Sequence, residues 1–62
     1  MKEAGTINFQ DASSSDEAVV VVRYDEKSVV VGISRKSDGD MEVALDQWTA
    51  NSLPEALRKA IE

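Results

Sequence analysis

The sequence predicts an α+β domain in which an antiparallel four-stranded meander is followed by one C-terminal helix. Three observations predict it. Segments rich in β-branched residues are separated by short polar breaks, "DG" marks a tight turn, and "SLPEALRKAIE" has apolar residues at helical spacing. The expected strands are 6–10, 18–24, 28–35 and 40–45, and the expected helix is 47–61, either continuous or broken near 51–53.

The chain is small and acidic. Its 62 residues form one domain, 1–62, with twelve acids against seven bases and a net charge of −5. There is no cysteine and no histidine, which removes disulfides, thiolate metal sites and the commonest general base. Folds of this size usually need a disulfide, a metal or a partner subunit. We therefore expect no catalytic, metal or cofactor-binding residues, and a partner subunit as the remaining support.

The location follows from the same composition. Absence of cysteine fits the cytoplasm, and no stretch approaches the ~18 apolar residues of a membrane helix. The N-terminus, "MKEAGTINFQ", lacks the apolar core of a signal peptide. The sequence thus predicts a soluble cytoplasmic protein with no membrane partner.

The first strand is expected to place Ile7 and Phe9 on one face. The segment 11–17, "DASSSDE", has no apolar periodicity and many side chains that compete for backbone hydrogen bonds, so it is predicted to be a flexible loop. We interpret its serine run, Ser13–Ser15, as part of a plain connector, and the alternative is that these serines are phosphorylated.

The second and third strands are expected to pair around a two-residue loop at Asp25-Glu26. That register sets Val22 opposite Val29 and Val20 opposite Val31. We prefer it to a one-residue slip because it keeps Arg23 off the more apolar face.

The third and fourth strands are expected to meet through a three-residue loop, Ser37–Gly39, with Gly39 in the left-handed region. This register pairs apolar with apolar residues, because Ile33 then lies opposite Val43, and Val31 opposite Leu45. The alternation puts Met41, Val43 and Leu45 inward.

Two start signals compete for the helix. Ser52 with Glu55 has the spacing of a capping box, which would place Pro54 in the first turn. Asp46 is the alternative cap, for an earlier turn through "QWTA". In one continuous helix, Trp48 would lie about 140° from Leu53 around the axis. Either two helical pieces meet near 51–53, or Trp48 serves a surface other than the apolar stripe.

One helix covers one face of a four-stranded sheet. The residues expected beneath its stripe of Leu53, Leu57 and Ile61 are Val20, Val22, Val29, Val31, Ile33, Val43 and Leu45. Val19, Val21 and Val30 remain on the other face. Leaving them exposed would forgo roughly 1.5–3 kcal/mol each, so the sequence predicts that this face, or an exposed edge beside it, is buried in a homodimer. The alternative is a monomer that tolerates a small exposed valine patch.

Four cations gather along the central ribbon and its turns: Arg23, Lys27, Arg35 and Lys36. As solvated edge charges they discourage edge pairing. The functional alternative is a strip that binds anions or nucleic acid. The acidic net charge opposes generic nucleic-acid binding, which depends on a basic surface.

The order of elements is similar to that of the C-terminal domain of the PC4-like transcriptional coactivators. The matching features are an Arg that ends a strand in "VVRYDEKSVVVGISRK", the acidic "DGDM", and the Gln-Trp pair of "ALDQW". This resemblance implies a four-stranded sheet with one helix, dimerisation and non-specific single-stranded DNA binding. It would make Arg23, Lys27 and Arg35 backbone contacts.

Together these features predict a non-enzymatic interaction module that forms a homodimer, whose partner is itself or another protein. The alternative is a PC4-like binder of single-stranded nucleic acid. A third candidate is an acidic regulator that mimics nucleic acid and blocks a basic protein.

Overall fold

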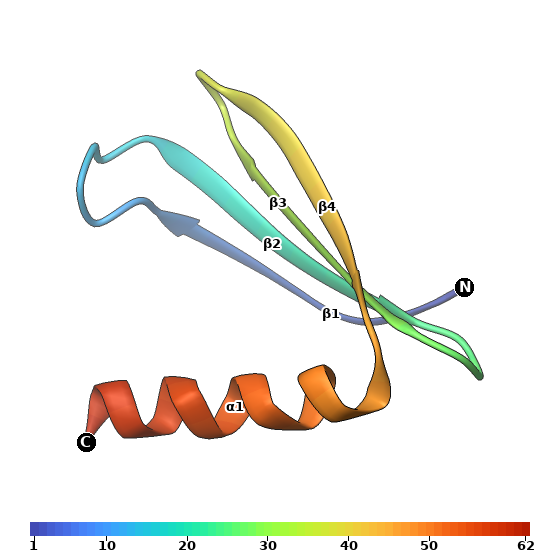
Figure 1. Ribbon diagram of the computed structural model, residues 1–62. Coiled ribbons are helices and arrows are strands. Elements are labelled where there is room, and N and C mark those ends of the chain that lie inside the picture. Colours follow the sequence, from blue (N-terminus) through green and yellow to red (C-terminus); the bar gives the residue numbers. More distant parts are fainter.

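The computed structural model describes all 62 residues and confirms the predicted fold class (Figure 1). Four strands form one antiparallel sheet in the order β1-β2-β3-β4, and a single helix follows. The elements are β1 (Lys2–Gln10), β2 (Glu17–Tyr24), β3 (Val29–Arg35), β4 (Gly39–Leu45) and α1 (Gln47–Ile61).

Strand β1 begins at Lys2, earlier than the predicted 6–10. The segment before Thr6 has little β-propensity, but it continues the backbone ladder with β2 as far as Tyr24. An irregularity between Glu3 and Gly5 interrupts this pairing. Backbone pairing with β2, which has high β-propensity, therefore extends β1 beyond the segment that its own side chains predict.

The predicted pairing of β2 with β3 is wrong by two residues. Val22 lies opposite Val31 and Tyr24 opposite Val29, so the connection is longer than Asp25-Glu26. The Asp25 carboxylate builds it, since it accepts hydrogen bonds from the N–H groups of Lys27 at 2.8 Å and Ser28 at 2.9 Å. These bonds, that of Lys27 first, lower the pKa of Asp25. A shift of two keeps every side chain on its predicted face.

The β3–β4 register is also displaced by two residues. Val31 lies opposite Val43, Ile33 opposite Met41, and the ladder reaches Arg35 and Gly39. The connection is therefore 36–38 instead of Ser37–Gly39. The apolar-pairing criterion could not separate the two registers, because apolar residues recur at every second position. The left-handed conformation of Gly39 is confirmed, with φ of +85°.

Replacing Gly39 by alanine is expected to destabilise the protein by about 1 kcal/mol, because an L-residue is strained at this positive φ. No heavy atom lies within 4 Å of the added Cβ, so the loss would report backbone strain alone. Chemical denaturation measures it; an unchanged midpoint would mean that the turn readily adopts another conformation.

Helix α1 is continuous and begins at the earlier of its two predicted caps. Asp46 is the N-cap, and its side chain accepts a hydrogen bond from the Thr49 N–H at 2.8 Å. The capping box at Ser52 is wrong: the Ser52 hydroxyl instead donates to the Trp48 carbonyl at 2.9 Å, and Pro54 lies inside the helix. Since the helix is unbroken, Trp48 serves another surface, where it is 76% exposed.

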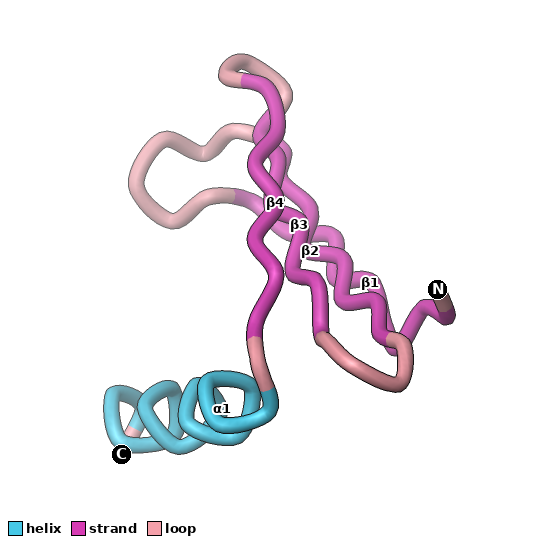
Figure 2. Tube along the Cα trace, turned by 45° about the vertical axis from the view of Figure 1, so that its right-hand side comes forward, coloured by secondary structure: helices cyan, strands magenta, loops and turns pink.

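The helix does not cover the sheet as predicted. Its main contact with the sheet is at β4, and its stripe grows more exposed along the chain, from Leu53 (42%) through Leu57 (56%) to Ile61 (84%). Ala18 is the one buried residue of the chain. Figures 1 and 2 show α1 diverging from the sheet after the short connection that follows β4. The radius of gyration is 12.6 Å, against about 10.6 Å for a compact domain of this length.

Candidate interaction surface

The two faces of the sheet differ in character. We call face A the side that carries Val20, Val22, Val31 and Ile33 on the central strands, as their cross-strand register places them together. The edge strands extend it with Ile7, Phe9, Met41, Val43 and Leu45. Face B carries Val19, Val21 and Val30, together with the charged Arg23, Asp40 and Glu42.

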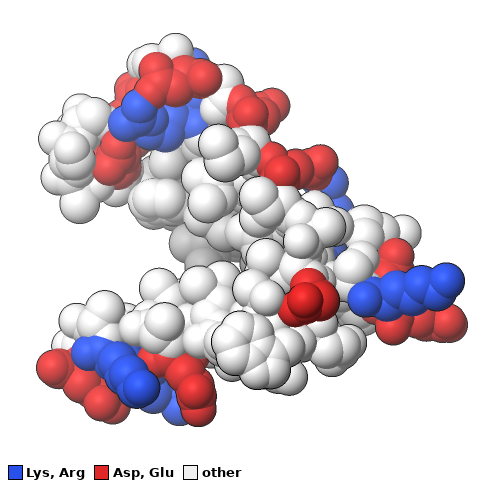
Figure 3. All heavy atoms as spheres, viewed as in Figure 1, with Lys and Arg blue, Asp and Glu red and all other residues white.

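Face A and helix α1 form the two walls of an open cleft. Figure 3 shows the hollow between sheet and helix, whose walls carry no Lys, Arg, Asp or Glu, while charged side chains lie on the outer surfaces. The charged residues of β2 and β4 belong to face B, so the sheet wall of the hollow is face A, whose β3 residues are apolar except for Arg35 at the end of the strand. Its members include Ile33, Val43 and Met41, which are about half or more exposed. The cleft is therefore a large apolar surface with nothing packed in it.

Face B holds the three valines that the sequence assigned to a dimer interface. Val19, Val21 and Val30 are half-buried there by their neighbours. Arg23 Nη1 and Glu42 Oε1 form an ion pair at 3.2 Å, with both side chains about half exposed. Gly32, which lies opposite Glu42, is among the residues that line a surface hollow of about 470 Å³. The assignment of these valines to the interface stays a prediction.

Gly32 has an opening for a methyl group. A Cβ built there would meet Glu42 Cγ at 3.5 Å, an ordinary contact, and the residue does not have a positive φ. Replacing Gly32 by alanine is therefore expected to stabilise the sheet by about 0.5 kcal/mol, since glycine weakens a strand interior. Thermal unfolding checks this. A loss of stability would show that the Arg23–Glu42 pair needs the bare backbone.

The predicted cationic strip is not brought together. Arg23 and Lys27 belong to the end of the sheet with the β2–β3 turn, whereas Arg35 and Lys36 belong to the opposite end. Carboxylates also engage three of the four: Arg23 with Glu42 at 3.2 Å, Lys36 Nζ with Glu17 at 3.8 Å, and Arg35 with two aspartates. The arrangement neutralises positive charge instead of concentrating it.

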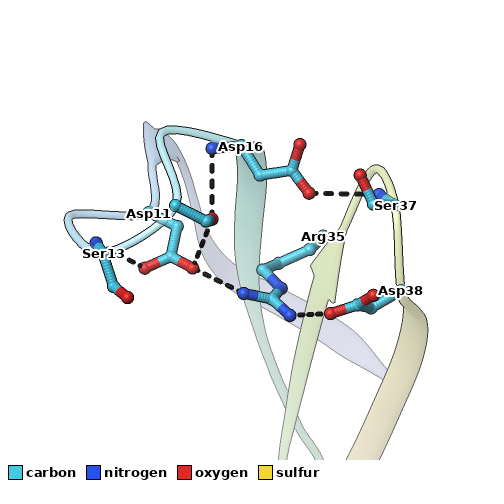
Figure 4. Close-up of polar contacts among 7 residues, drawn as sticks. Asp11, Ser13, Asp16, Arg35, Ser37 and Asp38 are labelled. Carbon is cyan, nitrogen blue, oxygen red and sulfur yellow. Dashed lines mark hydrogen bonds and ion pairs between the residues drawn. The ribbon is translucent and has the colours of Figure 1, made fainter.

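Arg35 joins two loops that are far apart in sequence (Figure 4). Its guanidinium donates to Asp11 Oδ2 at 2.7 Å and also pairs with Asp38. The hydrogen bond from Arg35, followed by those from the Ser13 N–H and the Ser14 hydroxyl, lowers the pKa of Asp11 to about 2. The cluster fixes the β1–β2 loop against the β3–β4 turn.

Asp16 adds a second tie between these loops, because its carboxylate accepts from the Ser37 N–H at 3.3 Å. Residues 11–16, which connect β1 and β2, are thus held by specific hydrogen bonds, and Glu17, which the sequence placed in this loop, begins β2. Two serines of this loop donate hydrogen bonds to the Asp11 carboxylate, the Ser13 N–H at 3.1 Å and the Ser14 hydroxyl at 2.8 Å. The local signal was an aspartate followed at two and three residues by serines, a turn-forming pattern.

Comparison with models of known protein families, with curated proteins and with solved structures finds no match for this chain. Its one helix is neither long enough nor apolar enough to cross a membrane.

Proposed function

We propose that this protein is a non-enzymatic interaction module whose working form is a homodimer. The observation that carries the proposal is that a single residue of 62, Ala18, is buried in the isolated chain. Folding has to offset the conformational entropy of every ordered residue. Because both walls of the cleft are uncovered, a single chain buries little apolar surface with which to offset this entropy cost.

The exposed area supports the same proposal. The chain exposes 5144 Å², whereas a compact monomer of its mass exposes about 4,000 Å². The excess of roughly 1,100 Å² per chain is larger than the ~800 Å² that each partner contributes to a standard interface. A dimer that covered this excess would have the area and apolar character of an obligate assembly.

Thermal unfolding at several chain concentrations tests the proposal. Because an obligate homodimer unfolds to two chains, its melting temperature is expected to rise with protein concentration. Circular dichroism over a hundredfold range in chain concentration measures the shift. A melting temperature that is independent of concentration would refute the dimer.

The single-stranded nucleic-acid alternative receives less support, since carboxylates already pair Arg23, Arg35 and Lys36. We expect no binding of a fluorescently labelled single-stranded oligonucleotide at low salt. Binding that weakens steeply as salt is added would instead favour the alternative, because that dependence reports counterion release from phosphates.

A further inference from the structure

We propose that the occupant of the cleft is the helix of a second copy: α1 of each chain packs its apolar stripe on face A of the other. This inference rests on the proposed dimer and specifies its architecture. The stripe consists of Leu53, Leu57, Ala60 and Ile61, which recur at helical spacing. None of the helix residues is buried within its own chain.

The helix and the sheet face match in length and in chemistry. The 15 residues of α1 span about 22 Å at 1.5 Å per residue. The seven residues of β3 span about 23 Å at 3.3 Å per residue. One helix laid along the sheet therefore covers the central strands from end to end. The stripe carries no charge. The charged residue of β3 on this face, Arg35, lies at the end of the strand and is already paired with Asp11 and Asp38.

The helix is held away from its own sheet by a one-residue connection. Strand β4 ends at Leu45, the helix begins at Gln47, and Asp46 alone joins them. Asp46 is extended, with ψ of 175°, its side chain accepts from the Thr49 N–H, and its carbonyl accepts from the Ala50 N–H at 2.9 Å. With a single linking residue, the direction of α1 relative to β4 is set by the few backbone torsions around Asp46. A short, restrained hinge of this kind favours exchange between copies.

A second copy satisfies both unpartnered surfaces at once. Each chain offers one apolar sheet face without a helix and one apolar helix without a sheet. In a two-fold dimer the same contact is made twice, helix of one on sheet of the other, and the assembly closes. The excess area of about 1,100 Å² per chain fits this reciprocal contact.

Cysteine cross-linking tests the architecture, because the chain contains no native cysteine. Val31→Cys marks face A, and Leu57→Cys marks the helix stripe. The two single variants, one carrying an affinity tag, are mixed in denaturant, refolded together and treated with a short thiol-specific cross-linker. We expect a covalent heterodimer between the two variants. The matched control replaces Val31→Cys by Val30→Cys, the neighbouring position on face B, and should lose this product.

The other outcomes are distinguishable. A Val31→Cys homodimer alone would mean that two sheets meet through face A, and a Val30→Cys homodimer alone would place the interface on face B; either overturns the helix exchange. A double variant, Val31→Cys with Leu57→Cys, that cross-links only within one chain would show that the helix closes on its own sheet. A melting temperature independent of chain concentration would refute the dimer itself and therefore the proposed function.

A second pair of variants avoids cysteine chemistry. Leu57→Glu puts a charge in the centre of the stripe and is expected to convert the dimer to an unfolded or monomeric chain. Asn51→Glu introduces the same residue about 120° around the helix, off the stripe, and should leave the dimer intact. Equal retention of the dimer by both variants in sedimentation would overturn the exchange.

Discussion

Replacing Val31 by aspartate is expected to abolish both the dimer and cooperative unfolding. Val31 lies at the centre of face A, paired with Val22 on one side and Val43 on the other. In the proposed dimer the new carboxylate would be buried under the partner's helix without a counter-charge. Such burial costs at least about 3 kcal/mol, a large part of a small domain's total stability.

Val30→Asp is the matched control, because it introduces the same residue at the neighbouring position on the opposite face. Val30 lies directly opposite Arg23 on β2, so a carboxylate there meets a positive charge on an already polar face. We expect this variant to stay dimeric and to unfold cooperatively. If Val30→Asp dissociated and Val31→Asp did not, the interface would lie on face B, where the sequence placed it with Val19 and Val21.

Replacing Arg35 by methionine should lower the melting temperature more than any other loss of a single cation. Methionine keeps a long, flexible side chain similar to the aliphatic part of arginine, but it lacks the guanidinium that joins Asp11 to Asp38. Two aspartates from separate loops would then lie close together without their shared cation. The control is Arg23→Met, which removes an exposed pair with Glu42 alone and is expected to change stability by less than about 0.5 kcal/mol. Equal effects of the two substitutions would mean that the cluster at Arg35 is not structural.

The same cluster gives a pH dependence of stability with a definite sign. The pKa of Asp11 is lowered from 3.8 to about 2 in the folded chain, with the Arg35 hydrogen bond as the largest cause. A lowered folded-state pKa adds stability that is fully present above the unfolded pKa and is lost as pH falls through the folded one. The wild-type protein should therefore lose stability between about pH 5 and pH 2. Arg35→Met should lose less over that interval, as melting temperatures across it would show; parallel curves would contradict the assignment.

The strands and their faces could be predicted because side chains alternate with a period of two. Val20, Val22 and Val31 belong together in any register that preserves this alternation. For the same reason, the alternation could not exclude a displacement of two residues. The turns decided the register, through the Asp25 carboxylate at one end of β3 and the turn beside Arg35 at the other.

The direction of the helix lay beyond the sequence pattern. An apolar stripe indicates that a helix packs on an apolar surface, but it does not indicate whether that surface belongs to the same chain or to a second copy. Here Asp46 alone links β4 to α1 and caps the helix, so the backbone torsions around it set the direction of α1. The Arg35 cluster was equally hidden, since it joins Asp11 and Asp38 from two separate connections.

Sedimentation equilibrium of the unmodified chain at micromolar concentration measures whether the homodimer forms. We predict a single species with twice the mass of the 62-residue chain and no folded monomer on dilution. A folded, cooperatively unfolding species with the mass of one chain would contradict it, because the cleft between face A and α1 would then remain uncovered in a stable protein.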